Sequence, residues 1–529
     1  MSELSGMLFV GGNAVAGEGV SLRGVNPATA TNLEPEYREA TVGQVADAVV
    51  AAEAAFRIYS RFPAKKRAEF LRAIADELQN CGMLLLERAN LETGLPIIRL
   101  ESERLRTTNQ LRLMADVIEE GSWVEARIDT GDASRQPLPK PDLRRMLVPL
   151  GPVAVFSASN FPFAYAIAGG DVATAFAAGC TVVCKGHPAH PGTSEMSAAA
   201  LYRAAVRTGI PAGVFSLVQG WAHEVGTALV THPLIRAVGF TGSLRGGRAI
   251  FDAAAKRAEP IPVYAEMGSV NPIFLLPSAV KQRTDAIVAG LANSMTQGVG
   301  QFCTSPGVIL GIESESFSQL LNALEEKLQN TEPGVMLYDG LFRNWRAAVD
   351  RATNSGATVV AKAASTDLPT RAQQTLLATD VSTFLSHDDL RSEMFGPAAV
   401  VVTGKSMADL ERVADALEGQ LTATIFGTDE ELAEHANLVF LLQRKVGRLI
   451  FNGYPTGLEV GHAIVHGGPY PASTDSRTTA VGSAAISRFA RPVCFQNFPE
   501  AALASELRNE NTNDMWRMIN GTPSKVDIE

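Results

Sequence analysis

Residues 151–184 read GPVAVFSASNFPFAYAIAGGDVATAFAAGCTVVC, and Asp171 is the only charged side chain among them. A membrane-spanning helix needs roughly 20 apolar residues whose backbone stays helical, whereas Asn160, Pro162, Gly169 and Gly170 interrupt this run. Strands of a parallel sheet that is covered on both faces are nearly continuous in apolar residues. The stretch therefore predicts a buried strand, a turn, a helix over 163–178 and a second buried strand over 181–184.

Strand and helix patterns continue to alternate along the rest of the chain. Further strands are predicted at 214–218, 237–240 and 263–264, with helices at 194–207, 222–230 and 245–256. A second series has strands at 272–276, 308–312, 398–403, 422–426 and 446–451, with helices at 280–297, 316–330, 406–417 and 428–441. Such alternation predicts two α/β regions with parallel, doubly wound sheets.

The remaining segments differ from these regions in their residue patterns. Residues 41–120 predict helices that begin near Thr41, Pro63 and Ser102. Residues 123–149 are polar and contain Pro137, Pro139 and Pro141 before a β-like end at 146–149, which suits an arm or a linker. Residues 453–483 are rich in Gly, Pro and Ser, as a loop lining a site would be, and the polar tail 501–529 is predicted to form a short helix with a frayed end.

Composition limits the classes of function. The 529 residues suit two or three domains, and 46% hydrophobic with 19% charged residues is ordinary for a globular protein. The formal net charge of −10 repels nucleic acid and anionic membranes, so neither is an expected partner.

Five cysteines, an odd number at low density, argue against a disulfide framework. The N-terminus also lacks the pattern of a signal peptide, and we therefore expect a cytoplasmic protein. Cys180 and Cys184 are four residues apart in an apolar run without a second Cys/His pair at metal spacing, so they are interpreted as buried thiols and no metal site is predicted.

The segment 297–305, QGVGQFCTS, contains a candidate nucleophile, Cys303. Its glycines allow a sharp turn and the close approach of a ligand, so the thiol can act in covalent catalysis. The alternative is a small core residue. The segment 240–248, FTGSLRGGR, follows a strand and opens a helix, whose free N–H groups favour phosphate. An ordinary turn is the alternative, and the G-x-G-x-x-G fingerprint is absent.

Three further polar residues follow predicted strands or precede a turn. Asn160 follows a buried strand, where its amide can donate to an oxyanion or merely cap a turn. Glu266 ends an apolar strand and is either a general base with a raised pKa or a capping or ion-paired residue. Glu393 precedes a Gly-Pro turn, where a surface carboxylate is the alternative.

Together these segments resemble the aldehyde dehydrogenase superfamily over roughly residues 20–500. The resemblance implies a Rossmann-type cofactor domain (1–122 and 150–267), a second α/β catalytic domain (268–484) and a small β oligomerisation arm (123–149 and 485–500), with 501–529 as a tail. It also implies a homodimer or homotetramer, in which the arm joins the 485–497 strand of the same or a partner chain.

The resemblance assigns roles residue by residue. Cys303 in 300–303 is the nucleophile that forms a thioester, Asn160 in the Asn-Phe-Pro motif is the oxyanion donor, and Glu266 is the base that activates water. Lys185 is similar to the lysine that reaches the adenosine ribose, and Glu393 to the residue that holds the nicotinamide ribose. The other implied cofactor residues are Ser157, His187, Pro188, Gly242, Ser243, Arg245, Gly246, Gly247 and Phe395.

Two departures from the family pattern bear on the cofactor and the base motif. NAD-preferring members often carry a Glu three residues after the lysine, and Pro188 stands there. Without that carboxylate a 2′-phosphate is not repelled, and Arg245 can help to neutralise it, so NADP is favoured slightly over NAD. Ser269 replaces the second glycine of the base motif, and the sequence suggests no role for it.

The segments 186–195, GHPAHPGTSE, and 459–469, EVGHAIVHGGP, resemble a subgroup of that superfamily. It contains α-ketoglutaric semialdehyde (2,5-dioxopentanoate) dehydrogenases and NADP-dependent fatty aldehyde dehydrogenases. The carboxylate of the former substrate needs a cationic partner, for which Arg477 is a candidate, although a structural role for this arginine is the favoured interpretation. Phe163 and His462 are further substrate candidates. For His462 and His466, buried structural roles are preferred to a place at the substrate entrance.

Two alternatives to hydrolytic aldehyde oxidation remain. An acylating enzyme would pass the thioester to coenzyme A, but such relatives tend to lack the base that Glu266 supplies. A non-catalytic scaffold protein would have no need to retain Cys303, Asn160 and Glu266 together.

Overall fold

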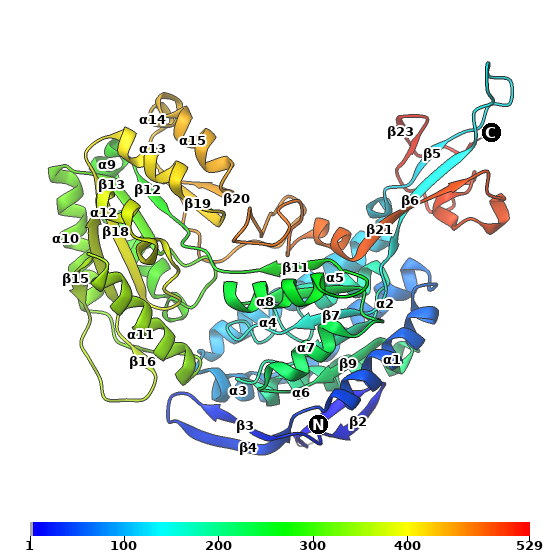
Figure 1. Ribbon diagram of the computed structural model, residues 1–529, viewed down its shortest axis with the longest axis horizontal. Coiled ribbons are helices and arrows are strands. Elements are labelled where there is room, and N and C mark those ends of the chain that lie inside the picture. The colour runs from blue at the N-terminus through cyan, green and yellow to red at the C-terminus, as the bar shows by residue number, and fades with distance from the viewer. Residues whose placement is uncertain (1–3, 529) are drawn as a thin grey trace.

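The computed structural model describes residues 4–528, which form two sheet-centred bodies and a projecting arm (Figure 1). The first sheet has the strand order β11-β10-β7-β8-β9-β1-β2. The five strands from β11 at one edge to β9 are parallel, and in chain order they follow the 3-2-1-4-5 arrangement of dinucleotide-binding domains, which confirms the predicted Rossmann-type fold. The strands are β1 (Met7–Val10), β2 (Asn13–Ala16), β7 (Val153–Phe156), β8 (Val182–Lys185), β9 (Phe215–Val218), β10 (Ala237–Thr241) and β11 (Val263–Glu266); a separate hairpin joins β3 (Ser21–Asn26) to β4 (Thr31–Arg38).

Helices cover both faces of this sheet, which explains its continuous apolar strands. In β7, Val153 and Val155 enter one core cluster, and Ala154 and Phe156 enter the cluster on the opposite face. Every side chain of the strand is therefore buried. The helices of this body are α1 (Val42–Tyr59), α2 (Ala64–Asn80), α3 (Gly82–Thr93), α4 (Ile97–Glu120), α5 (Gly170–Ala178), α6 (Pro191–Thr208), α7 (His223–Thr231) and α8 (Leu244–Ala255).

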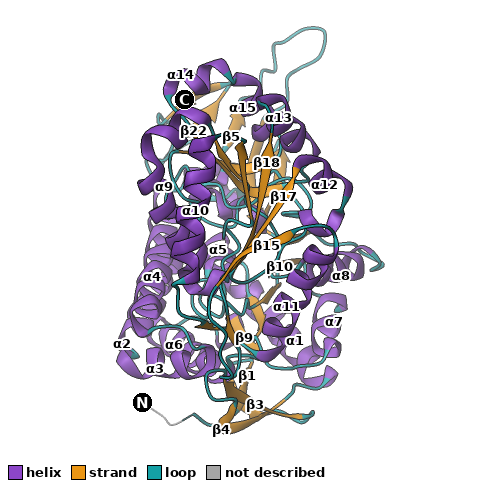
Figure 2. Cartoon of the chain, turned by 90° about the vertical axis from the view of Figure 1, so that its left-hand side faces the viewer, coloured by secondary structure: helices purple, strands orange, loops and turns teal. Residues whose placement is uncertain are grey.

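The second sheet has the order β15-β17-β18-β13-β12-β19-β20 and is parallel except for the edge pair β15–β17. Figure 2 shows its strands between helices on either side. The strands are β12 (Ile273–Leu275), β13 (Val308–Ile312), β15 (Thr358–Lys362), β17 (Thr375–Asp380), β18 (Ala398–Gly404), β19 (Gln420–Phe426) and β20 (Val446–Phe451), and the pair β14 (Gly334–Val335) and β16 (Arg371–Ala372) lies apart. The helices are α9 (Pro277–Thr296), α10 (Glu315–Gln329), α11 (Asp339–Asn354), α12 (Val381–Ser386), α13 (Met407–Ala416), α14 (Asp429–Glu434) and α15 (Ala436–Gln443).

The arm is a five-stranded sheet that extends away from both bodies (Figure 1). Its strands are β5 (Arg127–Asp129), β6 (Leu143–Pro149), β21 (Ala490–Gln496), β22 (Arg517–Ile519) and β23 (Thr522–Ser524). β21 pairs with β6 of the same chain. The prediction of a helical tail over 501–529 is wrong, because this segment adds β22 and β23 to the sheet and buries Leu507 and Met515 in its core.

The helix predicted over 163–178 is half as long in the structure. Residues 162–168 form turns, and the helix α5 begins at Gly170. The backbone N–H groups of Phe163 and Ala164 donate to the buried carboxylate of Glu103, on α4, at 2.8 and 3.0 Å. The first N–H groups of a helix have no partner within it, so Glu103 holds these turns in place without replacing helical hydrogen bonds. The carbonyl groups are diverted instead: that of Tyr165 accepts from the N–H of Ala158 at 2.8 Å, and that of Ala164 from the N–H of Gly170 at 3.0 Å. The sequence interpretation also missed α3, and it merged α14 with α15. No helix formed by residues 4–528 combines the length and apolar character that crossing a bilayer requires.

Phe176 allows a direct test of the first core. Its ring is fully buried and packs against Phe70, with the ring centres 5.3 Å apart. We expect Phe176→Ala to lower the free energy of unfolding by about 3–5 kcal/mol, since the cavity adds to the lost transfer energy. Urea unfolding followed by circular dichroism measures this. The matched control, Phe440→Ala at a half-exposed surface position, should change it by less than about 0.5 kcal/mol, and equal shifts in both variants would contradict the assignment.

Candidate active site

Three reactive side chains from distant parts of the chain meet between the two sheets. Glu266 ends β11 of the first sheet, Cys303 precedes β13 of the second, and His466 comes from the 453–483 loop. The His466 Nε2 atom lies 2.9 Å from Glu266 Oε2 and 3.6 Å from Cys303 Sγ. The imidazole is therefore placed between thiol and carboxylate, where it can carry a proton from one to the other.

The backbone before Cys303 turns sharply. Gly298, Val299 and Gly300 all have positive φ values, of 56°, 59° and 65°. A positive φ is energetically unfavourable for a β-branched residue such as Val299. A side chain at Gly300 would also meet the backbone oxygen of Gly396 at 2.3 Å. Only glycine thus fits at position 300, where the nucleophile loop packs on the loop that carries Glu393.

A buried amide network fixes the position of Cys303. The Asn271 Nδ2 group donates to the backbone oxygens of Cys303, at 2.8 Å, and of Ser305, at 2.9 Å. The Ser269 hydroxyl donates to Asn271 Oδ1 at 2.9 Å and accepts from the N–H of Leu421 at 3.0 Å. Ser269, which the sequence left without a role, therefore links the base motif to the nucleophile loop, and sequence reasoning missed Asn271 altogether.

Asn160 contacts the loop that carries the nucleophile. One of its amide N–H groups donates to the backbone oxygen of Gln301 at 3.0 Å, two residues from the nucleophile. An amide nitrogen carries two donors, so the second remains for a ligand. The backbone oxygen of Asn160 accepts from Arg99 at 2.8 Å, which holds this turn in place. The oxyanion role itself stays a prediction.

The charges of the site act on one another. Burial raises the pKa of the Cys303 thiol well above its ordinary value, and the Glu266 carboxylate raises it further. Burial alone would also raise the pKa of Glu266, but the adjacent His466 and Cys303 outweigh it and the pKa ends below its ordinary value. The raised pKa suggested for Glu266 is therefore wrong, because a hydrogen-bonding imidazole was not foreseen. The carboxylate is ionised at neutral pH and the thiol is protonated.

The same three residues offer ligand atoms that lie within 4.8 Å of one another. Thiolate, imidazole and carboxylate together suit Zn²⁺. An ion held there would occupy the sulfur that must act as nucleophile, so metal binding and thiol catalysis exclude each other at this site.

The Glu393 side chain lies beside the base motif. Its Oε1 atom accepts from the N–H of Ser269 at 3.5 Å, and a side chain at Gly268 would meet its Oε2 at 2.7 Å. Burial raises the pKa of Glu393 to about 7. Phe395 is half-buried two residues later. This places the predicted ribose-holding carboxylate a short way from Cys303.

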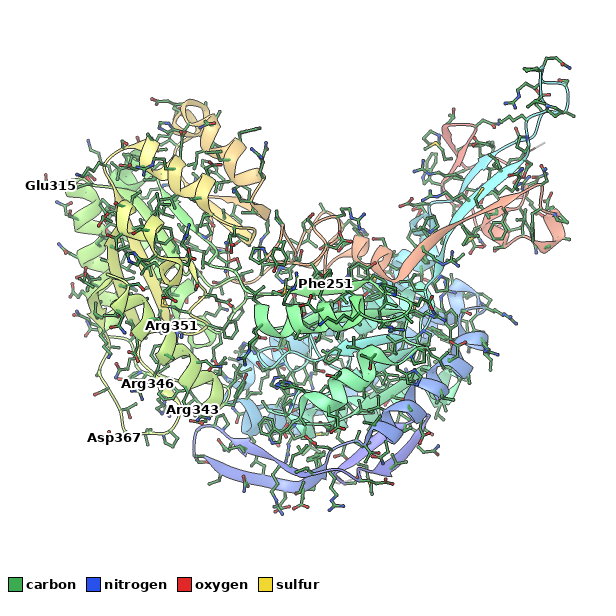
Figure 3. All side chains as sticks on the ribbon, in the orientation of Figure 1. Phe251, Glu315, Arg343, Arg346, Arg351 and Asp367 are labelled. Carbon is green, nitrogen blue, oxygen red and sulfur yellow. The ribbon has the colours of Figure 1, made fainter. Side chains whose placement is uncertain are left out.

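The predicted phosphate loop opens α8, the helix on which Figure 3 labels Phe251. The Ser243 hydroxyl accepts from the N–H of Gly246 at 3.2 Å and thus caps the helix. A side chain at Gly247 would meet Met267 Sδ at 2.6 Å. Gly242 and Arg245 are exposed in front of the helix N-terminus. The structure shows that Ser243 caps α8, whereas phosphate binding at this helix N-terminus stays a prediction.

The predicted adenosine end is formed by residues after β8. The Lys185 ammonium group donates to the backbone oxygen of Gly220 at 2.7 Å, and burial lowers its pKa to about 8. Burial holds the pKa of His187 well below its ordinary value, so this ring carries no charge for a phosphate. Pro188 is half-buried beside it, and the Ser157 hydroxyl lies 3.5 Å from Cys184 Sγ inside the sheet.

The three predicted substrate residues lie in different surroundings. Phe163 is 3% exposed within the core of the first body. The Arg477 side chain is 86% exposed and pairs with Asp475 at 2.8 Å. His462 is exposed, so the preferred buried role is wrong for this residue, whereas His466 is buried and hydrogen-bonded as preferred. Its contact with Cys303, 163 residues away in the chain, had no signal in the sequence.

Comparison with known proteins identifies the scaffold. A model of the aldehyde dehydrogenase family matches residues 15–482. The chain belongs to the aldehyde dehydrogenase family. Its α/β fold with two sheet-centred bodies is the aldehyde dehydrogenase fold, as the resemblance in sequence implied.

Two relatives match this aldehyde dehydrogenase over nearly its whole length. The α-ketoglutaric semialdehyde dehydrogenase 2 of Azospirillum brasilense is 44% identical over 523 residues, covering 98% of this chain and 99% of its own. The α-ketoglutaric semialdehyde dehydrogenase of Acinetobacter baylyi is 43% identical over 526 residues, with the same coverage. Among solved structures, betaine aldehyde dehydrogenase of Staphylococcus aureus in complex with NAD⁺ aligns with a TM-score of 0.81 at 20% identity, over 94% of this chain and 96% of that one.

The repulsion between Glu266 and the Cys303 thiolate predicts a measurable shift. Replacing Glu266 by Gln removes a negative charge that raises the thiol pKa. The pH midpoint of iodoacetamide alkylation at Cys303 should therefore move down, by about one pH unit or more. The measurement is made on a Cys494→Ser background, because Cys494 is exposed. Glu315→Gln, far along the chain on α10, serves as the control, and an unmoved midpoint in Glu266→Gln would show that the two groups do not interact.

Proposed function

We propose that this aldehyde dehydrogenase oxidises 2,5-dioxopentanoate to 2-oxoglutarate with NAD(P)⁺, through a thioester on Cys303. Relatives at 44% and 43% identity, which cover 98% of the chain, are α-ketoglutaric semialdehyde dehydrogenases. The meeting of Cys303, His466 and Glu266 is the observation that carries the chemistry. A thiol, a proton carrier and a base are what thioester formation and hydrolysis require.

Cys303, His466, Asn160 and Glu266 each act at a defined step of this reaction. The Cys303 thiol passes its proton to His466, and the sulfur adds to the aldehyde carbon. The free N–H of the Asn160 amide and the backbone N–H of Cys303 stabilise the oxyanion. The bound nicotinamide supplies the acceptor for hydride. Glu266, ionised beside His466, then takes a proton from the water that hydrolyses the thioester, and the carboxylic acid is released.

Residues around the first sheet would hold the cofactor. Glu393 accepts hydrogen bonds from the nicotinamide ribose, Ser243 and the N-terminus of α8 hold the pyrophosphate, and Lys185 reaches the adenosine ribose. NADP⁺ is favoured slightly over NAD⁺. The support is that Pro188 stands where a carboxylate would repel a 2′-phosphate and that the exposed Arg245 lies at the phosphate loop.

Other reactions on this scaffold are less well supported. A fatty aldehyde dehydrogenase would need a long apolar channel without a buried charge. Coenzyme A-acylating enzymes do not need a water-activating base, and here Glu266 is 3% exposed and in contact with His466. We further propose a homodimer or homotetramer assembled through the arm, acting in the cytoplasm, where the five unpaired cysteines would stay reduced.

A substrate panel tests the assignment. Purified protein with 2,5-dioxopentanoate should reduce both NADP⁺ and NAD⁺, with the higher kcat/KM for NADP⁺, as read by absorbance of the reduced nicotinamide. Cys303→Ala should abolish turnover, because no thioester can form, whereas Cys494→Ser should keep it. Full activity of Cys303→Ala, or a clear preference for long alkyl aldehydes, would contradict the proposal.

Glu266→Gln separates the two halves of the reaction. In stopped-flow mixing, this variant should release one equivalent of reduced cofactor per site and then stall, with steady turnover at least about 100-fold slower. The amide keeps the shape of the carboxylate but cannot deprotonate water. Loss of the burst together with turnover would place Glu266 before hydride transfer instead.

A further inference from the structure

Aromatic rings lie next to the catalytic residues: Phe302 precedes Cys303 in the chain, and the Tyr165 ring centre is 5.9 Å from that of His466. Phe161 packs edge-on against Tyr165 and Phe302, with ring centres 5.3 and 5.2 Å apart. These rings belong to one buried cluster, against which Leu458, Val460 and Ile464 of the 453–483 loop pack. Such walls suit the methylene groups of a substrate but cannot bind its charged end. Any group that recognises a carboxylate must therefore enter this cluster from another element.

Two guanidinium groups of α4 do so. Arg99 lies 4.8 Å from the centre of the Phe161 ring and 5.3 Å from that of Phe302, and Arg106 is the second. Arg106, on α4, lies over the rings of Tyr165 and Phe161 at 5.2 and 5.7 Å, and its Nη2 donates to the Tyr165 hydroxyl at 3.0 Å. Its Nε is buried without a hydrogen-bond partner. Its positive charge also opposes the rise in the pKa of Cys303, so it acts on the nucleophile itself. The cation thus points into the aromatic cluster within electrostatic reach of the reacting sulfur.

The neighbouring carboxylate, that of Glu103, attracts Arg106 from a distance, but its oxygens contact other groups. Arg99 lies two helical turns earlier on the same face of α4 and forms an ion pair with Glu103 at 2.9 Å. The other Glu103 oxygen accepts the N–H groups of residues 163 and 164. Glu103 is therefore paired with Arg99, and no carboxylate in the stretch 4–528 forms an ion pair with Arg106.

A third guanidinium nearby, that of Arg448 on β20, has a different task. It donates to the backbone oxygens of Pro455, at 2.7 Å, and Gly457, at 3.2 Å. These bonds hold the start of the loop that walls the aromatic cluster. Arg448 is therefore a structural anchor, and Arg106 is the cation that remains for a ligand.

We propose that Arg106 binds the carboxylate of the substrate and sets the specificity for short oxo acids over alkyl aldehydes. A guanidinium fork matches a carboxylate with two parallel hydrogen bonds. Before substrate arrives, the direct partners of this partly buried charge within residues 4–528 are the Tyr165 hydroxyl and the ring faces. An uncharged alkyl chain would add no partner for it. This assignment rests on the proposed function, and it replaces Arg477, whose side chain faces solvent and already pairs with Asp475.

Two aldehydes that differ only at the far end of the chain test the proposal: 5-oxopentanoate carries a carboxylate and pentanal a methyl group. Wild-type protein should have a higher kcat/KM for 5-oxopentanoate. In Arg106→Met the ratio of the two kcat/KM values should fall by about 100-fold, mainly through the KM of the acid. Arg106→Lys should recover part of that ratio, because it restores the charge without the fork. Arg112→Met, on the same helix but surface-exposed and paired with Asp76, should leave the ratio unchanged.

The outcomes separate this inference from the substrate assignment. A parallel loss with both aldehydes in Arg106→Met would mean a structural role and overturn the inference, as would a wild type that does not distinguish the two. A wild type that prefers 5-oxopentanoate to pentanal but does not oxidise 2,5-dioxopentanoate would overturn the proposed substrate while leaving Arg106 as the carboxylate-binding residue.

Discussion

The position of one thiol depends on two hydrogen bonds from a buried amide. Asn271 donates to the backbone oxygen of Cys303 itself and to that of Ser305, two residues later. The Asn271 side chain is in turn oriented by Ser269 and by Thr422 of β19. The network ties the end of the first sheet to the strands of the second, so the two bodies cannot shift without moving the reactive sulfur. Precise positioning of this kind is what an enzyme needs for attack on a carbonyl carbon.

The charged groups around the Cys303 sulfur have different roles. A buried thiol beside a carboxylate resists ionisation, which keeps Cys303 protonated until a carbonyl and a proton acceptor are both present. His466, in contact with both groups, supplies the path for that proton. On the far side of the aromatic rings, Arg106 offers a charge of the opposite sign. The site thus separates a proton-transfer end from an anion-binding end, with apolar walls between them.

Local patterns in the sequence predicted much of the fold. Uninterrupted apolar strands predicted the parallel sheets, because strands buried on both faces have no polar positions. The prediction was wrong where other contacts overrode the local pattern. The carbonyl groups of Ala164 and Tyr165 accept from Gly170 and Ala158, which keeps the backbone before α5 in turns, and the polar tail joins the arm as β22 and β23. The extra histidine of the site escaped prediction for the same reason, since nothing within the loop marks its neighbours.

By itself, the sequence determined the fold class, the family resemblance and the chemical identity of the candidate nucleophile, base and amide, because these lie in short motifs whose spacing is local. Only the tertiary structure decided how the motifs act on one another. It brought His466 between Cys303 and Glu266, assigned Ser269 a partner, and distinguished the solvent-exposed Arg477 from the buried Arg106. Those outcomes depend on burial and on contacts between segments far apart in the chain, and neither quantity is encoded in any single stretch of residues.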